Sequence, residues 1–260
     1  MKWAEQTLIA LDLETTGVDP ATARIWEIGA ADRHGVTRQI LVNPEVEIPA
    51  EVATMCGLTP ADLESIYWDK PLFRAVSDDL CRMIAGRIVV GYNILSYDWP
   101  LLEAEFRRQG RSIEGDCRYI IDVLVWVRYL HPRLPSHKLA EVATHFGVDG
   151  GTAHRAVADC MMTLGILARL APSIPEDLDE LLELQATLKE EQDHDYASYA
   201  HWLAKDRTPE GRGRLFLACG KYRGTYLTDA DPGFLRWAMN KVSDLPAAVI
   251  QAFRERVEGR

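Results

Sequence analysis

The first 172 residues alternate short apolar runs with amphipathic stretches, and this alternation limits the folds that the chain can adopt. The apolar runs predict strands at 6–13, 24–32, 36–42, 87–90 and 117–121. The amphipathic stretches predict helices at 71–84, 99–109, 122–130, 136–147 and 152–170. Ser136 and Ser173 stand where they would cap the helices that follow them. Strands that alternate with helices indicate an α/β domain with layers of helix and sheet.

Two carboxylates, Asp12 and Glu14, stand at the end of the first predicted strand. Side chains alternate along a strand, so the two acids point to the same face about 7 Å apart. Like charges this close repel each other and are costly to remove from water. Taken alone, this pattern favours a strand that ends in solvent, where two neighbouring acids are not costly. The polar turn that follows, Thr15-Thr16-Gly17, also suits a site where backbone N–H groups approach a ligand.

Two later stretches supply further groups of the same kind. Asp98 follows the Gly91-Tyr92-Asn93 turn near a helix start, a position where the helix dipole also favours an acid. His154 and Asp159 lie near the end of the α/β region. On one helix they would be about 140° apart, so they face one point only if His154 precedes the helix or lies in its first turn.

In this order, the three motifs resemble those of the DEDDh 3′→5′ exonucleases, a family with an RNase H-like fold. The matching residues are, motif by motif, Asp12 and Glu14, then Asp98, then His154 and Asp159. The resemblance covers about residues 6–171. It implies a mixed five-stranded sheet with flanking helices.

The chain departs from the family pattern at two places. Tyr92 and Tyr97 stand where the family's second motif has His and Phe, and the spacing to Asp98 is one residue longer. Cys56 stands where members often have His, within a segment (47–63) that resembles the family's region near the terminal base. We expect Cys56 to alter contacts to the substrate end and to leave the chemistry unchanged.

The resemblance also implies a reaction, the hydrolysis of DNA from the 3′ end with release of nucleoside 5′-monophosphates, in repair or proofreading-type processing. The four acids would hold two Mg²⁺ ions, for which Mn²⁺ can substitute, and the ions would stabilise an in-line displacement at phosphorus. His154 would take the proton from the attacking water. We predict that residues beside the motifs contact the 3′ end: Leu13, Thr15, Thr16, Met55 and Asn93.

Two other functions stay open at this point. An RNA-directed 3′ exonuclease, similar to RNase T or oligoribonuclease, is the alternative within the enzymes. A non-catalytic nucleic-acid-binding subunit is the alternative from another class, and the presence of all five candidate residues argues against it. The sequence also leaves open a homodimer and the choice between single-stranded and double-stranded DNA.

The charge distribution divides the rest of the chain. The net charge is −10, yet residues 176–195 alone carry −8 and residues 205–223 carry +4. We therefore predict three parts: an exonuclease domain at 1–172, an acidic helical connector at 173–205 and a small α+β module at 206–260.

The last of these parts has a resemblance of its own. Residues 219–241 are similar to the C-terminal module of the exodeoxyribonuclease X family. Lys221 and Arg223 lie in a predicted exposed turn and are candidates for phosphate contact. Phe234 and Trp237, three residues apart on a predicted helix, are interpreted as core residues rather than as a platform for bases.

The cysteine pattern indicates the cellular compartment in which the protein works. Five cysteines are scattered without a C-x-x-C pair, which is typical of reduced thiols in a cytoplasm rather than of disulfides or a zinc site. No apolar run reaches the roughly 18 residues that span a bilayer. The first residues also lack the pattern of a signal peptide. We expect a cytoplasmic protein that binds nucleic acid and no membrane.

Overall fold

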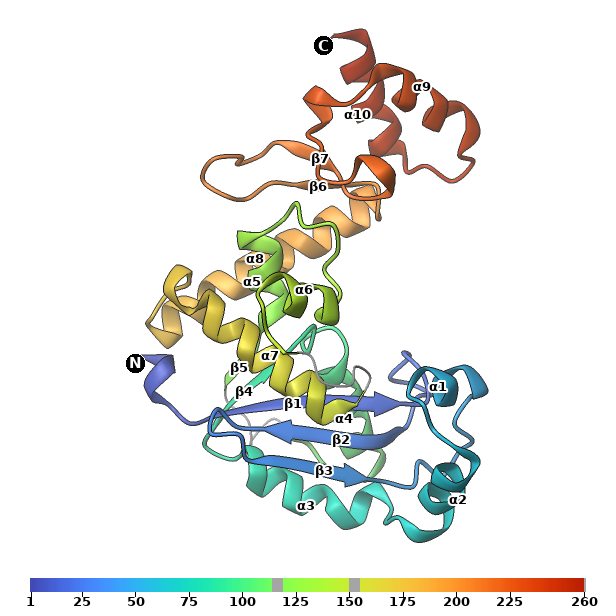
Figure 1. The fold of residues 1–260 in the computed structure, drawn as a ribbon, viewed down its shortest axis with the longest axis vertical. Coiled ribbons are helices and arrows are strands. Elements are labelled where there is room, and N and C mark those ends of the chain that lie inside the picture. Colours follow the sequence, from blue (N-terminus) through green and yellow to red (C-terminus); the bar gives the residue numbers. More distant parts are fainter. Residues whose placement is uncertain (114–118, 150–154, 260) are drawn as a thin grey trace. The chain divides into compact units, whose positions relative to one another are not determined.

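The computed structural model describes residues 1–113, 119–149 and 155–259. The chain forms two compact units, which are described separately here (Figure 1). The first contains Met1–Leu124 and Lys138–Leu182, and the second contains Val125–His137 and Glu183–Arg260. The predicted division into three parts, at residues 172 and 205, stays a prediction. The two units have other boundaries, because residues 125–137 group with the C-terminal part of the chain.

A mixed five-stranded sheet forms the centre of the first unit (Figure 1). Its strands in chain order are β1 (Leu8–Thr15), β2 (Ile25–Ala31), β3 (Thr37–Leu41), β4 (Ile88–Gly91) and β5 (Tyr119–Asp122). Their order in the sheet is β3-β2-β1-β4-β5, with β1, β2 and β3 antiparallel and β4 and β5 parallel to β1. The predicted fold class is confirmed, and the strand with the two acids is the central one.

Helices cover both faces of this sheet. The helices that begin before residue 160 are α1 (Ala50–Met55), α2 (Pro60–Asp69), α3 (Phe73–Ile84), α4 (Asp98–Arg108), α5 (Val123–Leu130), α6 (Leu139–His145) and α7 (Ala156–Leu170). Two of these helices, α1 and α2, are not predicted by the sequence pattern. The predicted cap at Ser136 was wrong, because Lys138 precedes the first turn of α6.

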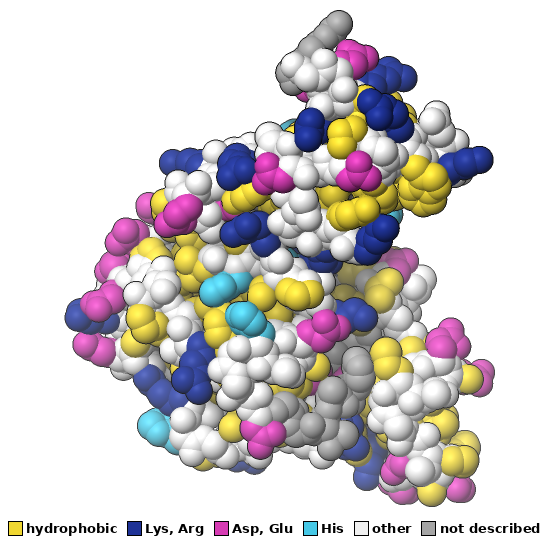
Figure 2. Space-filling model, turned by 45° about the horizontal axis from the view of Figure 1, so that its top comes forward, with side chains coloured by type: hydrophobic (Ala, Val, Ile, Leu, Met, Phe, Trp, Pro, Cys, Tyr) yellow, Lys and Arg dark blue, Asp and Glu magenta, His cyan; other side chains and the backbone are white. Residues whose placement is uncertain are grey.

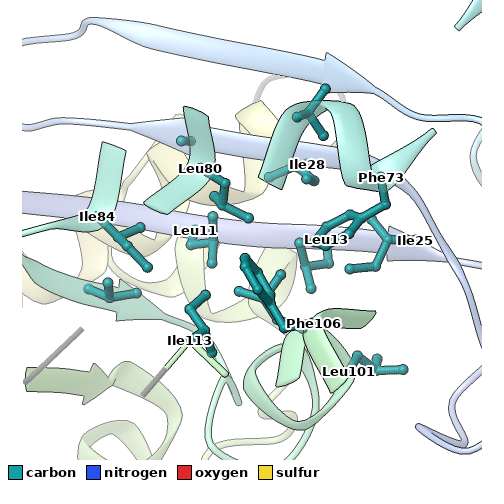
Figure 3. Close-up of a cluster of buried hydrophobic side chains, with 14 of the residues drawn as sticks. Leu11, Leu13, Ile25, Ile28, Phe73, Leu80, Ile84, Leu101, Phe106 and Ile113 are labelled. Carbon is teal, nitrogen blue, oxygen red and sulfur yellow. The ribbon is translucent and has the colours of Figure 1, made fainter. Parts of the chain in front are cut away.

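The core on one face of the sheet joins β1 and β2 to α3 and α4 (Figure 3). The side chains labelled in this cluster are Leu11, Leu13, Ile25, Ile28, Phe73, Leu80, Ile84, Leu101, Phe106 and Ile113. Full burial of each such side chain contributes roughly 1.5–3 kcal/mol, so this cluster fixes β1 firmly in place. Since alternate residues point to opposite faces, the inward direction of Leu11 and Leu13 sends Asp12 and Glu14 to the other face.

The other face of the sheet is covered by α7, which packs on β1 and β2. Small buried residues make this contact close, with Ala10, Ala31 and Cys160 in one cluster. Among the described residues, one segment, Ala156–Ser173, has the length and apolar composition of a membrane span. In the folded chain this segment is largely α7, the core helix of the sheet.

The second unit has a core of its own, formed by α8 (Leu178–Tyr199), β6 (Leu203–Lys205), β7 (Leu215–Leu217), α9 (Pro232–Lys241) and α10 (Ala247–Glu258). Leu217, Leu235, Val249 and Phe253 are buried at its centre. The predicted cap at Ser173 was wrong, because α8 begins only after Asp177, whose carboxylate accepts the backbone N–H groups of residues 179 and 180.

Candidate active site

Three carboxylates come together where β1 meets α7. Asp12 and Glu14 project from β1, and Asp159 projects from the first turn of α7. One oxygen of each carboxylate lies within 4.8 Å of the others. The structure therefore brings together three of the five predicted catalytic residues. His154 lies outside the described residues.

A glycine opposite Asp12 allows α7 to come this close. Gly29 of β2 is the register partner of Asp12, and a Cβ atom built on it would lie 2.3 Å from the carbonyl carbon of Ala156. The Sγ–H group of Cys160 donates to the Gly29 carbonyl at 3.3 Å. Direct contact between the start of α7 and β2 therefore sets the position of Asp159 beside Asp12.

The fourth acid, Asp98, reaches β1 through a tight turn after β4. Asn93 has a positive φ of 66°, and Gly91 leaves the space that Ile94 fills. The carboxylate of Asp122 holds this turn by accepting the N–H groups of Asn93 at 2.9 Å and of residue 95 at 3.2 Å. Asp98 follows at the start of α4, where only 3% of it is exposed.

The Asp98 carboxylate is fixed to the same strand as the other acids. It accepts the backbone N–H of Leu13 at 2.9 Å, between Asp12 and Glu14. Its charge is the largest of the neighbouring charges that raise the pKa of Asp12. The longer spacing in the second motif therefore still delivers this acid to the end of β1.

Burial and mutual repulsion raise the pKa values of three of these acids, Asp12, Glu14 and Asp98. Burial raises the pKa of Glu14 to about 7 and that of Asp98 to about 8. Burial, followed by the charges of Asp98 and Asp159, raises the pKa of Asp12 well above its usual range. Divalent cations would remove the repulsion. Because every candidate ligand is an oxygen atom, the site fits hard cations such as Mg²⁺ and Mn²⁺.

Cys56 contacts this site directly, which differs from the expectation that it would affect the substrate end. The helices α1 and α2 pack around Trp26 and bury Cys56 among them. Its Sγ–H group donates to Oε2 of Glu14 at 3.5 Å. Burial and the charge of Glu14 raise the pKa of the Cys56 thiol to about 12, so it stays protonated and acts as a donor.

A fifth acid near the site, Glu27, was missed by the sequence analysis. It is the register partner of Glu14 on β2 and is fully buried. Its carboxylate accepts a hydrogen bond from Nε2 of Gln39 at 3.0 Å and lies 3.6 Å from Nε of Arg155. The signal that could have found Glu27 is a lone acid inside the apolar run of residues 25–31. Its charge raises the pKa of Glu14 further.

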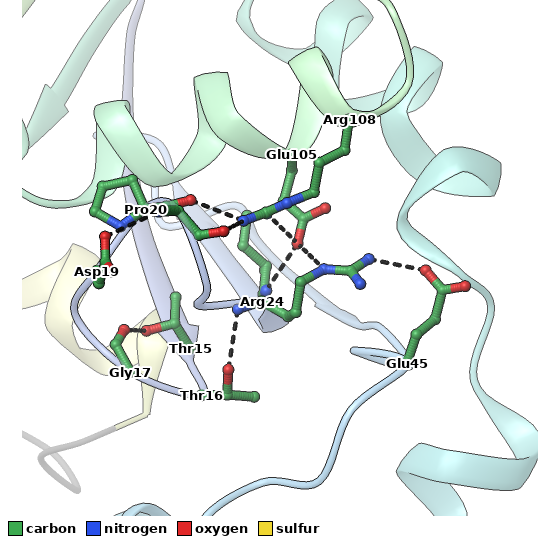
Figure 4. Close-up of polar contacts among 11 residues, drawn as sticks. Thr15, Thr16, Gly17, Asp19, Pro20, Arg24, Glu45, Glu105 and Arg108 are labelled. Carbon is green, nitrogen blue, oxygen red and sulfur yellow. Dashed lines mark hydrogen bonds and ion pairs between the residues drawn. The ribbon is translucent and has the colours of Figure 1, made fainter.

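The turn after β1 is held in one conformation by polar contacts (Figure 4). The Thr15 hydroxyl donates to the Gly17 carbonyl at 2.6 Å and lies 2.7 Å from the Tyr97 hydroxyl. The Thr16 hydroxyl accepts the backbone N–H of Arg24 at 3.0 Å. Both threonine side chains, predicted to contact the 3′ end, are thus engaged within the protein.

The far end of this turn is anchored by a buried acid. Glu105 of α4 is 2% exposed and accepts Nε of Arg24 at 2.7 Å, and Nη1 of Arg108 lies 3.3 Å from it. Arg108 also donates to the carbonyl of Pro20 at 2.7 Å (Figure 4). Two arginines on one buried carboxylate therefore fix the segment between β1 and β2, beside the candidate site.

The other predicted contact residues lie in different surroundings. The Leu13 side chain is in the core, and its N–H is bound to Asp98, whereas Met55 is 56% exposed at the end of α1. In the second unit, Arg223 donates from Nε to the Leu134 carbonyl at 2.9 Å. Lys221 is exposed. The roles of these residues in substrate binding stay predictions.

Comparisons with known proteins point to one family. The RNase T family model, described as an exonuclease, matches residues 9–167. The uncharacterized exonuclease CP81 of Escherichia phage 186 is 31% identical over 182 residues, which cover 65% of this chain and 91% of that protein. DNA polymerase III subunit epsilon of Treponema pallidum is 29% identical, covering 62% of this chain and 74% of that protein.

The fold is shared with solved structures of exonuclease I. E. coli exonuclease I in complex with a dT13 oligonucleotide has a TM-score of 0.56 and 18% identity, covering 92% of this chain and 60% of that chain. At this identity the likeness concerns the fold alone. The chain spans only 13% of a PolC-type DNA polymerase III from Caldanaerobacter subterraneus that it also matches.

The substitution Gly29→Ala should separate α7 from β2, because the new Cβ would overlap the backbone of Ala156. We expect the free energy of unfolding to fall by about 1–3 kcal/mol, and metal-induced stabilisation to weaken as Asp159 moves away from Asp12. Chemical denaturation with and without Mn²⁺ measures both effects. Gly17→Ala is the control, since its Cβ would lie 3.9 Å from the nearest atom. Equal stability of the two variants would contradict this account.

Stability should depend on pH through the acids of the site. Their folded pKa values, about 7 for Glu14 and about 8 for Asp98, lie above the unfolded values near 4.5 and 3.8. The contribution of these two acids to the stability of the metal-free protein is therefore fully present below the unfolded values and is lost as pH rises through the folded ones.

Divalent metal binds the deprotonated acids, so Mn²⁺ should raise Tm more at about pH 8.5 than at about pH 5.5. Thermal melts with and without Mn²⁺ at the two pH values test this, with Asp98→Asn as the variant whose metal-free Tm should fall less with pH. The same Tm increase at both pH values would show that these acids do not titrate in this window.

Proposed function

The chain belongs to the RNase T exonuclease family, and on that premise we propose that it is a metal-dependent 3′→5′ exonuclease that hydrolyses DNA to nucleoside 5′-monophosphates. The observation that carries the proposal is the cluster of Asp12, Glu14 and Asp159, with Asp98 fixed beside it. Four repelling acids held this close, with Glu14 and Asp98 buried and Asp12 and Asp159 half-buried, are costly unless cations offset their charge.

Each acid has a place in this proposal. Asp12, Glu14 and Asp159 would hold the cations, two Mg²⁺ or Mn²⁺. Asp98, whose carboxylate is fixed by the Leu13 N–H, would add negative charge beside them. Such ions supply positive charge at the attacking and leaving oxygens of a phosphodiester. The Cys56 thiol orients the Glu14 carboxylate by donating to one oxygen and leaves the other oxygen free to bind metal.

The general base in this proposal is His154, which precedes the first residue of α7 by two positions in the sequence. Its role is to accept the proton of the attacking water. Arg155, the next residue, lies 3.6 Å from the buried Glu27, and this contact ties the start of α7 to β2. The residues that follow His154 are thus anchored to the strand next to the one that carries Asp12.

The choice of DNA and of the 3′ end rests on resemblance. The epsilon subunit of DNA polymerase III and exonuclease I with a dT13 oligonucleotide, among the similar proteins, support DNA as the substrate. The likeness to the exodeoxyribonuclease X family, a role in repair and a cytoplasmic location are parts of the same proposal. An RNA-directed 3′ exonuclease is the second candidate, because the acid cluster would serve either nucleic acid.

Digestion of end-labelled strands tests the proposal directly. With Mg²⁺ or Mn²⁺, a 5′-labelled DNA strand should shorten stepwise from its 3′ end, and RNA of the same sequence should be cut more slowly. Ca²⁺ should bind with looser geometry and fail to support hydrolysis. Full activity in excess EDTA would overturn the metal-dependent reading, and faster digestion of RNA would favour the second candidate.

Replacing the proposed base should separate chemistry from metal binding. We expect His154→Ala to lower the hydrolysis rate about 10²–10⁴-fold while Mn²⁺ still raises Tm as in the original protein. Asp12→Ala is the matched comparison, and it should lose both the activity and the metal-induced increase in Tm. Rates are measured in single turnover and Tm by thermal melts. A His154→Ala variant with the original rate would place the base elsewhere.

A further inference from the structure

The second unit carries three aromatic side chains in a row. The ring centroids of Tyr222 and Phe234 are 4.6 Å apart, and those of Phe234 and Trp237 are 5.9 Å apart. The last two rings are stacked, with an angle of 23° between their planes. We call Tyr222, Phe234 and Trp237 the aromatic row. It joins the turn after β7 to one face of α9.

The row runs from the core of the unit out to solvent. Tyr222 and Phe234 are half-buried and pack against the core residues of the unit. Trp237 is 54% exposed and is not among the residues of that core, so its interpretation as a core residue was wrong. Single exposed hydrophobic residues are common, but an exposed indole stacked on a half-buried ring is a rigid surface held in one orientation.

Basic side chains stand at both ends of the row. Nζ of Lys221 lies 4.8 Å from the centre of the Tyr222 ring. Lys241 follows Trp237 by four residues on α9, so the two share one helix face. Neither lysine forms an ion pair within the described part of the chain, whereas Arg207 and Arg214 of the same unit are paired with acids.

The C-terminal part of the unit has the positive charge that binding of a polyanion needs. Residues 203–260 contain eleven Lys and Arg against seven Asp and Glu, a net of +4, although the whole chain carries −10. Two of the acids near α9, Asp229 and Asp231, are used internally, whereas Asp244 after the helix is exposed. Asp231 caps the helix by accepting the N–H of Gly233 at 3.0 Å, and Asp229 pairs with Arg214 at 3.7 Å. Figure 2 shows Lys and Arg side chains beside hydrophobic patches over this C-terminal part of the chain.

We propose that the aromatic row is a stacking platform for unpaired nucleobases, with Lys221 and Lys241 binding the phosphates on either side. The outer face of Trp237 offers a flat surface for one base, and stacking on it requires no particular sequence. The inference rests on the proposed function only in taking nucleic acid as the partner. It assigns binding of the single strand to a surface that contains none of the carboxylate cluster.

Binding measured without hydrolysis tests this platform. The full chain in EDTA is titrated against two fluorescein-labelled strands of about 20 nucleotides. One is oligothymidine, and the other is an abasic backbone with the same phosphates and no bases. The abasic strand reports phosphate contacts alone, so the difference between the two affinities isolates stacking.

Trp237→Ala should weaken binding of oligothymidine about 5- to 100-fold and leave binding of the abasic strand unchanged. Trp237→Phe, which keeps a ring in place, should recover most of the affinity. Changing Lys221 and Lys241 together to Gln should weaken binding of both strands and reduce the salt slope by about 1.4. Trp68→Ala, which removes an indole that is 81% exposed on α2, is the control and should bind as the original protein does.

Unchanged binding of oligothymidine by Trp237→Ala would overturn the platform, as would an equal loss for both strands or an equal loss in Trp68→Ala. These outcomes differ from a failure of the proposed function. Binding through Trp237 without any hydrolysis would support the platform and contradict the proposed nuclease activity. A nuclease whose Trp237→Ala variant binds normally would keep the function and lose the platform.

Discussion

Repulsion among closely spaced acids is the constraint on which the first unit depends. The close approach of α7 at Gly29 and the bond from the Leu13 amide to Asp98 hold carboxylates together that would separate in a free chain. The packing of Leu11 and Leu13 on the opposite face supplies the opposing free energy, since it fixes the strand that carries the acids. The hydrophobic core and the polar site are thus two faces of one strand.

Much of this arrangement follows from the sequence because its signals are local. The alternation of strand and helix patterns predicts the α/β domain, the family resemblance implies its mixed five-stranded sheet, and alternation along β1 places Asp12 and Glu14 on one face. The ranges of α3 and α4 follow from apolar spacing. Trp237 was assigned to the core because helix spacing does not show how far the neighbouring elements extend over a face.

The rest depends on contacts between distant parts of the chain. Cys56 reaches Glu14 only because α1 and α2 pack around Trp26, and these two helices are too short for a clear periodic pattern. Glu27 appears in the sequence as one acid in an apolar strand, and its place opposite Glu14 depends on the register between β1 and β2. Ser136 and Ser173 also do not mark the starts of α6 and α8, because α6 begins after Lys138 and α8 begins after Asp177.

The second unit is assembled from two separate segments, with residues 138–182 of the first unit between them in the sequence. Trp126 of α5 is fully buried and donates to Gln185 at 3.2 Å, and Gln192 donates to the Val125 carbonyl at 3.0 Å. During synthesis, residues 125–137 therefore emerge before α8. Their apolar side chains cannot be buried until α8 has been made. A protease cut or a cloning boundary placed after α7 would leave this early segment without the residues that cover it.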